Sequence, residues 1–231
     1  MNKFNRQGKN ILIVVAHTDD ETIGMGGTIV NHIKDGDNVF AISMTDGVSA
    51  RDLYSKKEVN LRIASSINAA KILGFEWLQC GNFPDNEMDK CSLIEIIKFI
   101  ENAKDISNPD IVYTHSSADL NIDHRILSQA VLTAFRPMPN ETCKEIRVFE
   151  VPSATDYGHK SVTGFFSPNL YVDISDVWDK KLLALKEYSI EMMDYPSSRS
   201  LEGIKNLSKL RGNQVGVYQA EAFEIIRKIY P

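Results

Sequence analysis

The sequence predicts an α/β protein with a Rossmann-like, open and mostly parallel sheet flanked by helices. Residues 11–15 form a continuous apolar run rich in β-branched side chains, which is typical of a strand buried on both faces. Along the first two-thirds of the chain, short apolar runs alternate with segments that carry apolar residues at helical spacing. Such alternation of strand and helix implies right-handed crossovers between parallel strands.

The elements of this sheet follow in order along the chain. The first helix should end at the Asp-Gly-Asp turn of residues 35–37, the second at Gly74, and the fourth before Pro137. Residues 24–27 (Gly-Met-Gly-Gly) do not match the dinucleotide motif GxGxxG, and their small size favours close approach of the first helix to the sheet. Strands are expected at residues 11–15, 39–44, 75–79, 110–114 and 147–151, and helices at residues 23–34, 56–73, 93–103 and 122–135.

The pattern changes after Pro152, where one strand (residues 171–174) precedes two helices (residues 177–191 and 201–211). We expect this C-terminal segment, residues 152–231, to cover an edge of the sheet and to help wall a site. It would pack on a Rossmann-like core of about residues 10–151. Because no linker separates the two parts, residues 1–231 are predicted to form a single domain.

Length, composition and charge exclude several classes of protein. A chain of 231 residues buries enough surface to fold without a disulfide or a metal. Its 43% hydrophobic and 25% charged residues argue against disorder. The net charge is −5 and no Lys/Arg block occurs, which argues against a nucleic-acid partner.

Cysteine usage and hydropathy predict the compartment. The three cysteines show no CxxC spacing, as expected for reduced thiols. The longest early apolar run is too short for a transmembrane helix, and the first ten residues lack the apolar region of a signal peptide. We therefore expect a cytoplasmic protein with no membrane partner, and assembly into a homo-oligomer is left open.

Side chains that can bind a metal gather where two predicted strands end. Open α/β sheets bind small molecules and ions beyond the carboxyl ends of their strands. After the first strand comes Ala-His-Thr-Asp-Asp-Glu, residues 16–21. His17 and Asp20 are three positions apart, so both can face one point in a turn that enters a helix. His124, after a second strand, is the best candidate for a third ligand. This set suits Zn²⁺ with one position open for water, and Asp19 would be a free carboxylate beside it, as metal-assisted hydrolysis requires.

Each cluster taken alone has a simpler interpretation. Acidic residues before a helix often serve as caps and complement the helix dipole, which fits residues 19–21 equally well. Asp123 is equally compatible with an ordinary acid in the first turn of a helix. Two such clusters at the strand ends of one sheet favour a metal site over two coincidental caps.

These motifs resemble those of a known family, the PIG-L/LmbE-like N-acetylglucosaminyl deacetylases. Residues 16–21 look like its AHPDDE motif, and residues 119–125 like its second metal motif, of HPDHR type. Near the C-terminus, Arg-Ser at 199–200, Arg-Gly at 211–212 and Glu-Ala-Phe at 221–223 resemble its PRS…RG…EAF ending. The resemblance runs over nearly the whole chain.

The resemblance implies roles for individual residues. His17, Asp20 and His124 match the zinc ligands of the family, and Asp19 matches its general base. Asn121 stands where the family has a histidine near the reaction centre, and it can donate a hydrogen bond but cannot transfer a proton. Asp123, next to His124, is expected to orient a ligand or the loop of Asn121.

Substrate contacts are expected from five further residues. Arg62 matches a family arginine near the substrate, and Arg199 and Arg211 are candidates for contact with a phosphate or with sugar hydroxyls. Asp46 and His115, at other strand ends, are candidates for polar contacts in the same pocket.

The resulting prediction is a zinc-dependent hydrolase that removes the N-acetyl group from a 2-acetamido sugar, free or linked to a nucleotide or glycan. Its partner would be a small N-acetylated sugar or sugar conjugate. One alternative is a non-catalytic sugar-binding module on the same fold, which would not need Asp19 as an unliganded carboxylate. Another is a zinc amidase that acts on a different acyl-amino sugar conjugate, because specificity lies in loops that the fold does not fix.

Overall fold

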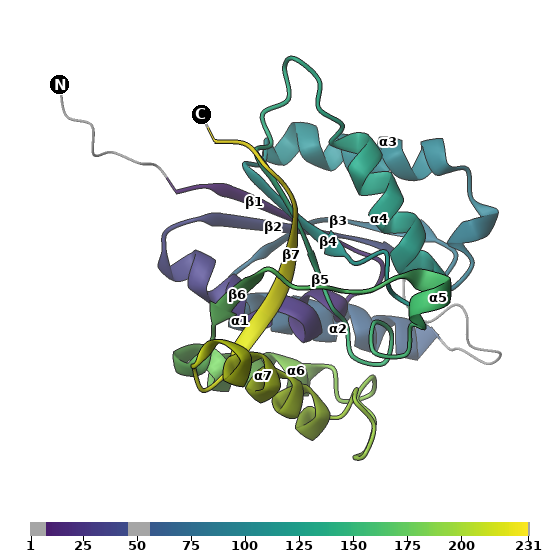
Figure 1. Ribbon diagram of the computed structural model, residues 1–231. Helices are drawn as coiled ribbons and strands as arrows, with labels where there is room; N and C mark the ends of the chain where they lie inside the picture. The colour runs from purple at the N-terminus through teal and green to yellow at the C-terminus, as the bar shows by residue number, and fades with distance from the viewer. Residues whose placement is uncertain (1–7, 46–55, 231) are drawn as a thin grey trace.

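The computed structural model, which describes residues 8–45 and 56–230, contains a seven-stranded sheet with the order β3-β2-β1-β4-β5-β7-β6 (Figure 1). Strands β1 to β5 pair in parallel, whereas β7 runs antiparallel to both β5 and β6. The predicted fold class is confirmed. The strands are β1 (Asn10–Val15), β2 (Asn38–Thr45), β3 (Glu76–Phe83), β4 (Ile111–His115), β5 (Glu145–Phe149), β6 (Leu170–Asp173) and β7 (Ala220–Lys228).

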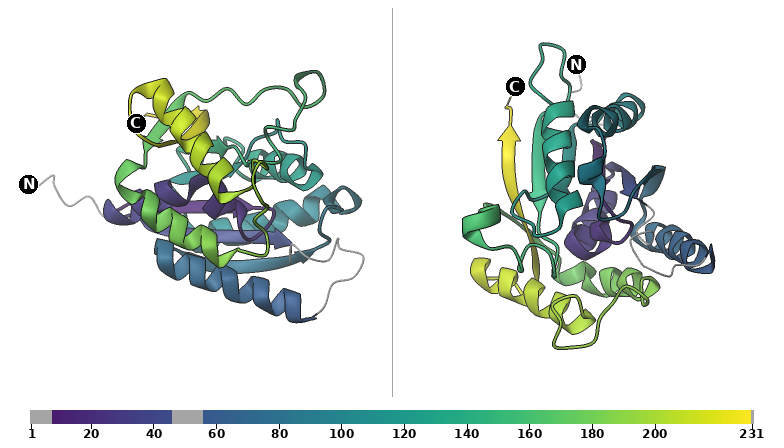
Figure 2. Two further views of the ribbon diagram at one scale, coloured as in Figure 1. Left: turned by 90° about the horizontal axis from the view of Figure 1, so that it is seen from below. Right: turned by 90° about the vertical axis from the view of Figure 1, so that its right-hand side faces the viewer.

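Helices cover both faces of the sheet, α3 and α4 on one and α1, α2 and α6 on the other (Figure 2). The central strand β1 supplies alternate side chains to both layers, Ile11 and Ile13 to one core and Leu12 and Val14 to the other. The helices are α1 (Asp20–Lys34), α2 (Lys56–Leu73), α3 (Leu93–Ser107), α4 (Ile122–Ala134), α5 (Lys160–Thr163), α6 (Trp178–Glu187) and α7 (Leu201–Val215), with 3₁₀ turns η1 (Met88–Lys90) and η2 (Ser175–Val177).

The C-terminal segment differs from its prediction in one main respect. Strand β7 was not expected, because charged residues interrupt its apolar pattern. It inserts between β5 and β6, so the segment extends the sheet as well as covering it. Helix α6 also ends at Glu187, short of the expected residue 191, and the chain then turns towards the carboxyl end of the sheet. In the described part of the chain, no helix has the length and hydropathy needed to cross a membrane.

Helix α1 is kinked, and a residue of β7 holds the kink. Met25 has non-helical dihedral angles (φ −145°, ψ 20°), which frees backbone groups on both sides of it. The Glu221 carboxylate accepts hydrogen bonds from the backbone N–H groups of Gly27 (2.9 Å) and Thr28 (2.7 Å). Gly24 lies so close to the sheet that an added Cβ would be 2.4 Å from Phe149, as its small size predicted. The carboxylate of Glu221 therefore acts as an internal N-cap.

The cation that balances Glu221 is Lys181, and we predict that its loss destabilises the fold. Its ammonium donates to Glu221 (2.6 Å) and to the backbone oxygen of Ile23 (2.7 Å), and its side chain is buried. In Lys181→Met, the carboxylate stays buried without a counter-charge, so the free energy of unfolding should fall by about 3–5 kcal/mol. Urea denaturation measures this loss. The neighbouring Lys180 is exposed, so Lys180→Met is the matched control and should change the free energy of unfolding by less than about 0.5 kcal/mol. Equal losses of this free energy in the two variants would contradict the internal cap.

Candidate metal centre

The candidate site lies where β1 and β4, neighbours in the sheet, reach their carboxyl ends. The turn between β1 and α1 carries His17 and Asp20, and the first turn of α4 carries His124. Helices α1 and α4 lie on opposite faces of the sheet, so the crevice between the two loops is a topological switch point, where open α/β sheets bind ligands.

Three side-chain atoms form a nearly equilateral triangle. The Nδ1 atom of His17 is 3.2 Å from Oδ2 of Asp20 and 3.3 Å from Nε2 of His124, and the last two atoms are 3.4 Å apart. Ligands about 2.0–2.1 Å from a tetrahedral ion stand about 3.3–3.4 Å from one another. The second oxygen of Asp20, Oδ1, is buried and has no hydrogen-bond partner among the described residues. The three residues therefore fit one face of a tetrahedral metal site.

Carboxylates hold the outer nitrogen of each histidine ring. The Nδ1 atom of His124 lies 2.7 Å from Oδ2 of Asp119, on the side of the ring opposite the triangle. The Nε2 atom of His17 lies 3.0 Å from Asp85 and 3.4 Å from Asp123. Such carboxylate–histidine pairs fix the ring orientation and the tautomer of metal-binding histidines.

Asp123 and Asn121 also fasten the loop after β3 to α4. The Asp123 carboxylate accepts hydrogen bonds from the backbone N–H groups of Asn86 (2.7 Å) and Met88 (3.0 Å). Asn121 is the N-cap of α4: its Oδ1 accepts from the Asp123 backbone N–H (2.8 Å), and its Nδ2 donates to Asn86 Oδ1 (3.0 Å). The placement of both residues fits the orienting role expected of Asp123.

Burial and the nearby carboxylates act in opposite directions on the pKa of each candidate histidine ligand. Burial lowers the pKa of His124, but the charges of Asp20 and Asp119 and their hydrogen bonds outweigh it and raise the pKa to about 9. His17 behaves alike: burial is outweighed by its bonds to Asp123, Asp20 and Asp85, and its pKa is raised well above the usual value. In the metal-free protein, protons therefore occupy the place of a cation.

His115, expected in the pocket, lies behind the site. Its ring stacks on that of His124 with centroids 3.7 Å apart, and its side chain is fully buried. Its Nε2 atom accepts a hydrogen bond from the backbone N–H of Ala16 (2.9 Å), so this nitrogen carries no proton. Burial and the charge of His124 lower the pKa of His115 well below the usual value. A neutral His115 supports the ring of His124 instead of facing the cavity.

Asp19 lies beside the site, and two arginines bind it. Its Oδ1 accepts from Nη2 of Arg62 (3.0 Å) and its Oδ2 from Nη2 of Arg199 (2.6 Å). Arg62 also pairs with Glu191 (2.7 Å), and the side chain of Asp19 is fully buried. Two of the three arginines expected near the substrate, one from α2 and one from the turn before α7, thus meet on the carboxylate expected to be the general base.

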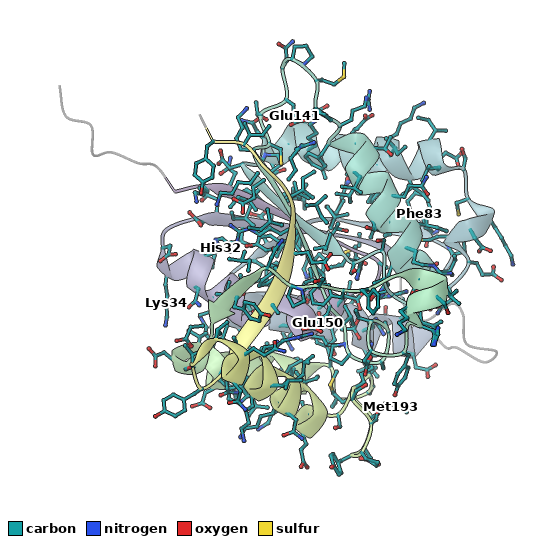
Figure 3. All side chains as sticks on the ribbon, in the orientation of Figure 1. His32, Lys34, Phe83, Glu141, Glu150 and Met193 are labelled. Carbon is teal, nitrogen blue, oxygen red and sulfur yellow. The ribbon has the colours of Figure 1, made fainter. Side chains whose placement is uncertain are left out.

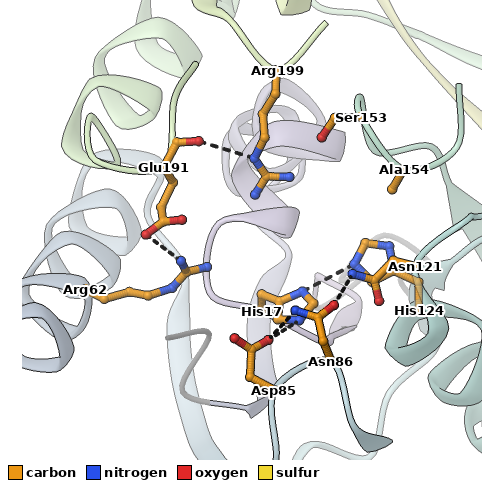
Figure 4. Close-up of a pocket in the computed structure, with 10 residues that line it drawn as sticks. All are labelled: His17, Arg62, Asp85, Asn86, Asn121, His124, Ser153, Ala154, Glu191 and Arg199. Carbon is orange, nitrogen blue, oxygen red and sulfur yellow. Dashed lines mark hydrogen bonds and ion pairs between the residues drawn. The ribbon is translucent and has the colours of Figure 1, made fainter. Parts of the chain in front are cut away.

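A polar cavity of about 390 Å³ opens over these residues (Figure 4). Six of the residues that line it carry charge or metal-binding capacity, and the other four are small or neutral polar. The lining residues are His17, Arg62, Asp85, Asn86, Asn121, His124, Ser153, Ala154, Glu191 and Arg199.

Two predicted contacts fall elsewhere. Arg211 lies on α7 and pairs with Glu150 through two hydrogen bonds of 2.6 Å; Glu150 is labelled in Figure 3. It does not line this cavity, because the pair ties α7 to the segment that leaves β5. Asp46 lies outside the described residues.

The structure adds Asp85, Asn86 and Glu191, which the sequence analysis did not single out. The first two follow β3, so the same rule of strand ends would have found them had β3 been assigned its full length to Phe83. The expected strand ends at residue 79, and Gly81 and Asn82, which follow it, interrupt the apolar pattern at the sheet edge. Glu191 had no sequence signal, since it lay inside a predicted helix.

Known proteins share the motifs and the fold of this chain. The family model described as PIG-L, GlcNAc-PI de-N-acetylase, matches residues 12–135. The chain belongs to the PIG-L family. This confirms the family resemblance, and N-deacetylation of an amino sugar, the predicted reaction, is the one for which the family is described.

Relatives of this PIG-L family chain are named for two kinds of reaction. An uncharacterized deacetylase of Escherichia coli is 29% identical over 185 residues, 78% of this chain and 90% of the relative. A 4-oxalmesaconate hydratase of Pseudomonas putida is 27% identical over 204 residues, 79% of this chain and 74% of the relative. The solved structure of N,N'-diacetylchitobiose deacetylase from Pyrococcus horikoshii gives a TM-score of 0.76 at 24% identity, over 95% of this chain and 84% of that chain, which shows the same fold.

We predict that His124→Ala loses bound metal while the PIG-L fold persists. The substitution removes one corner of the triangle and leaves the hydrophobic cores unchanged. Metal content after mild chelation, measured by mass spectrometry beside circular dichroism, tests this. His159→Ala, in an exposed loop, is the control and should keep its metal. Stoichiometric metal in His124→Ala would show that the ligand set is wrong.

Metal affinity should rise with pH. Because the pKa values of His124 and His17 lie above their usual range in the metal-free protein, this pair of rings retains protons that metal binding must displace. Below these pKa values, each displaced proton makes the affinity rise roughly tenfold per pH unit. Calorimetric titration of the chelated protein with Zn²⁺ at pH 6, 7 and 8 measures the slope. A flat profile would contradict the protonated state of the two rings.

Proposed function

We propose that this chain is a zinc-dependent N-deacetylase that releases acetate from a 2-acetamido sugar. The observation that carries the proposal is the triangle of His17, Asp20 and His124 at one end of a polar cavity, with the carboxylate of Asp19 next to Asp20 in sequence. Membership of the PIG-L family supports the same reaction. Two imidazoles and one carboxylate are a ligand set that suits Zn²⁺.

The residues of the chain divide the work of amide hydrolysis among them. A zinc ion held by the three ligands would supply Lewis acidity at the scissile carbonyl. Asp19 accepts the proton of the attacking water and returns it to the departing amine. An ionised carboxylate offers about four lone-pair sites, so two remain after Arg62 and Arg199 have each donated one bond.

Asn121 provides a neutral hydrogen bond in the cavity. Its Nδ2 donates one hydrogen to Asn86, and a primary amide nitrogen carries two. The second hydrogen is available for the oxygen that gains charge as the carbonyl is attacked. Since an amide cannot transfer a proton, Asp19 alone serves as acid and base in this version of the site.

A screen of N-acetylated sugars for metal-dependent acetate release tests the proposal. The zinc-loaded protein should release acetate from at least one sugar, and the chelated protein should not. Release of a different acid from another acyl-amino sugar would favour the amidase alternative. Binding of a sugar without turnover would favour the sugar-binding module, and hydration of 4-oxalmesaconate, the reaction named for one relative, would replace the proposal.

Asp19→Asn should keep its metal and lose turnover. The substitution preserves the shape of the side chain and removes its basicity, so kcat should fall by on the order of 10²–10⁴-fold. Asp20→Asn should instead weaken metal binding. Acetate release and metal content, measured together, separate the two roles.

Asp19→Asn also breaks an ion pair, so a control for that effect is needed. Glu150→Gln provides it, because it removes the carboxylate of another Arg–carboxylate pair outside the cavity. This variant should keep both metal and activity. If Asp19→Asn loses metal and Asp20→Asn keeps it, the two roles must be exchanged. If neither substitution changes acetate release, the deacetylase proposal fails.

A further inference from the structure

Three residues that line the cavity, Arg62, Glu191 and Arg199, form a charged cluster with the buried Asp19 behind them. We call these four residues the paired wall; its two guanidinium groups are neutralised by the chain itself. Arg62 directs each of its three nitrogens at an acceptor: Nε at Oγ1 of Thr18 (3.2 Å), Nη2 at Asp19 (3.0 Å) and Nη1 at Glu191 (2.7 Å). Its side chain is only 3% exposed. Each nitrogen of Arg62 therefore already has an acceptor within the chain, which uses three of its five N–H groups.

Two of the three nitrogens of Arg199 have acceptors among the described residues. Its Nη2 donates to Oδ2 of Asp19 (2.6 Å) and its Nε to the backbone oxygen of Glu191 (3.3 Å). Figure 4 shows Glu191 between the two guanidinium groups, its side chain towards Arg62 and its backbone towards Arg199. One short segment, the turn after α6, thus holds both arginines.

The charges of the paired wall sum to zero, since two guanidinium groups face two carboxylates. Across the cavity, Asp85 adds a further carboxylate 3.0 Å from His17. A phosphate or carboxylate on the substrate would find no uncompensated arginine among the described lining residues. Away from the positive charge held at the metal ligands, it would have to break the pair of Arg62 and Glu191, or remain beside the Glu191 carboxylate in a site of reduced dielectric. Sugar hydroxyls, in contrast, accept and donate hydrogen bonds without this cost.

We propose that the paired wall selects uncharged N-acetylated sugars over those bearing phosphate or carboxylate, and that Glu191 determines this preference. The inference rests on the proposed deacetylase activity and names its substrate class. Glu191 acts by cancelling the charge of Arg62, so its removal frees one guanidinium group to bind an anion. The preference is a difference between two substrates, which is the form in which specificity is measured.

The test compares kcat/KM for N-acetylglucosamine with kcat/KM for N-acetylglucosamine 6-phosphate and N-acetylmuramic acid. In the wild type, the anionic sugars should give about one-tenth of the value of the neutral sugar, or less. In Glu191→Gln, the ratio of anionic to neutral should rise by on the order of tenfold, because a carboxylate that is only 10% exposed is lost at hydrogen-bond distance from Arg62. Added salt should reduce this gain.

Two further variants separate local charge from other effects. Glu150→Gln makes the same change in net charge outside the cavity and should leave the ratio unchanged. Arg199→Gln removes a positive charge from the paired wall and should lower the ratio. It therefore tests the proposal in the opposite direction if Glu191→Gln does not fold by circular dichroism.

The outcomes distinguish this inference from the proposed function. Equal use of neutral and anionic sugars by the wild type, or an unchanged ratio in the folded Glu191→Gln and Arg199→Gln proteins, would overturn the inference and leave the deacetylase proposal standing. No acetate from any sugar would overturn the deacetylase proposal. Calorimetric binding of the same three sugars then gives the ratio without turnover, and tighter binding of an anionic sugar by the wild type would overturn the inference as well.

Discussion

Three consecutive acidic side chains, Asp19, Asp20 and Glu21, are fully buried in this protein, and much of the molecule serves to compensate them. Each carboxylate removed from water is costly unless it is paired or protonated. Their position at the start of α1 helps, since the positive end of the helix dipole favours negative charge. The remaining cost is met differently for each side chain.

The way in which each of the three buried acids is compensated defines the site. Asp19 is paired with two guanidinium groups, and Asp20 faces two imidazoles that share protons or a metal with it. Glu21 pairs with no cation among the described residues. Burial raises its pKa to about 8 despite a hydrogen bond from Thr22, so it is buried as the neutral acid and accepts from the hydroxyl of Tyr188 (3.0 Å). Three adjacent acids therefore lie in three different environments, and such differences separate acid and base roles within one site.

Much of this arrangement could be predicted from the sequence, and the part that could not has a common cause. The ligand triangle follows from local spacing in residues 17–20 and from the rule that loops after parallel strands meet at one edge of the sheet. The partners of the buried acids come from distant segments with no periodic signal: Arg62 from α2, Tyr188 from the turn after α6, and Arg199 from the turn before α7. In the sequence these residues look like ordinary surface or core positions, because pairing across 43 to 180 residues leaves no local pattern. Strand β7 was missed for a related reason, since its buried charge, Glu221, breaks the alternation of a strand to serve the kink of α1.

The C-terminal segment is consequently part of the site's electrostatics as well as of its shape. Glu221 fixes the course of α1 just beyond the metal ligands, while Arg199 holds the carboxylate that precedes them. A Rossmann-like core without this segment would leave Asp19 with one guanidinium group instead of two and the kink without its cap. The charge balance also extends to the metal. In the metal-free state the raised pKa values of His17 and His124 place protons where a divalent cation would lie, so metal binding exchanges one kind of positive charge for another beside the same Asp20. A buried acidic cluster of this kind needs a positive charge at its centre in every state, and the fold supplies a site in which either protons or a metal can provide it.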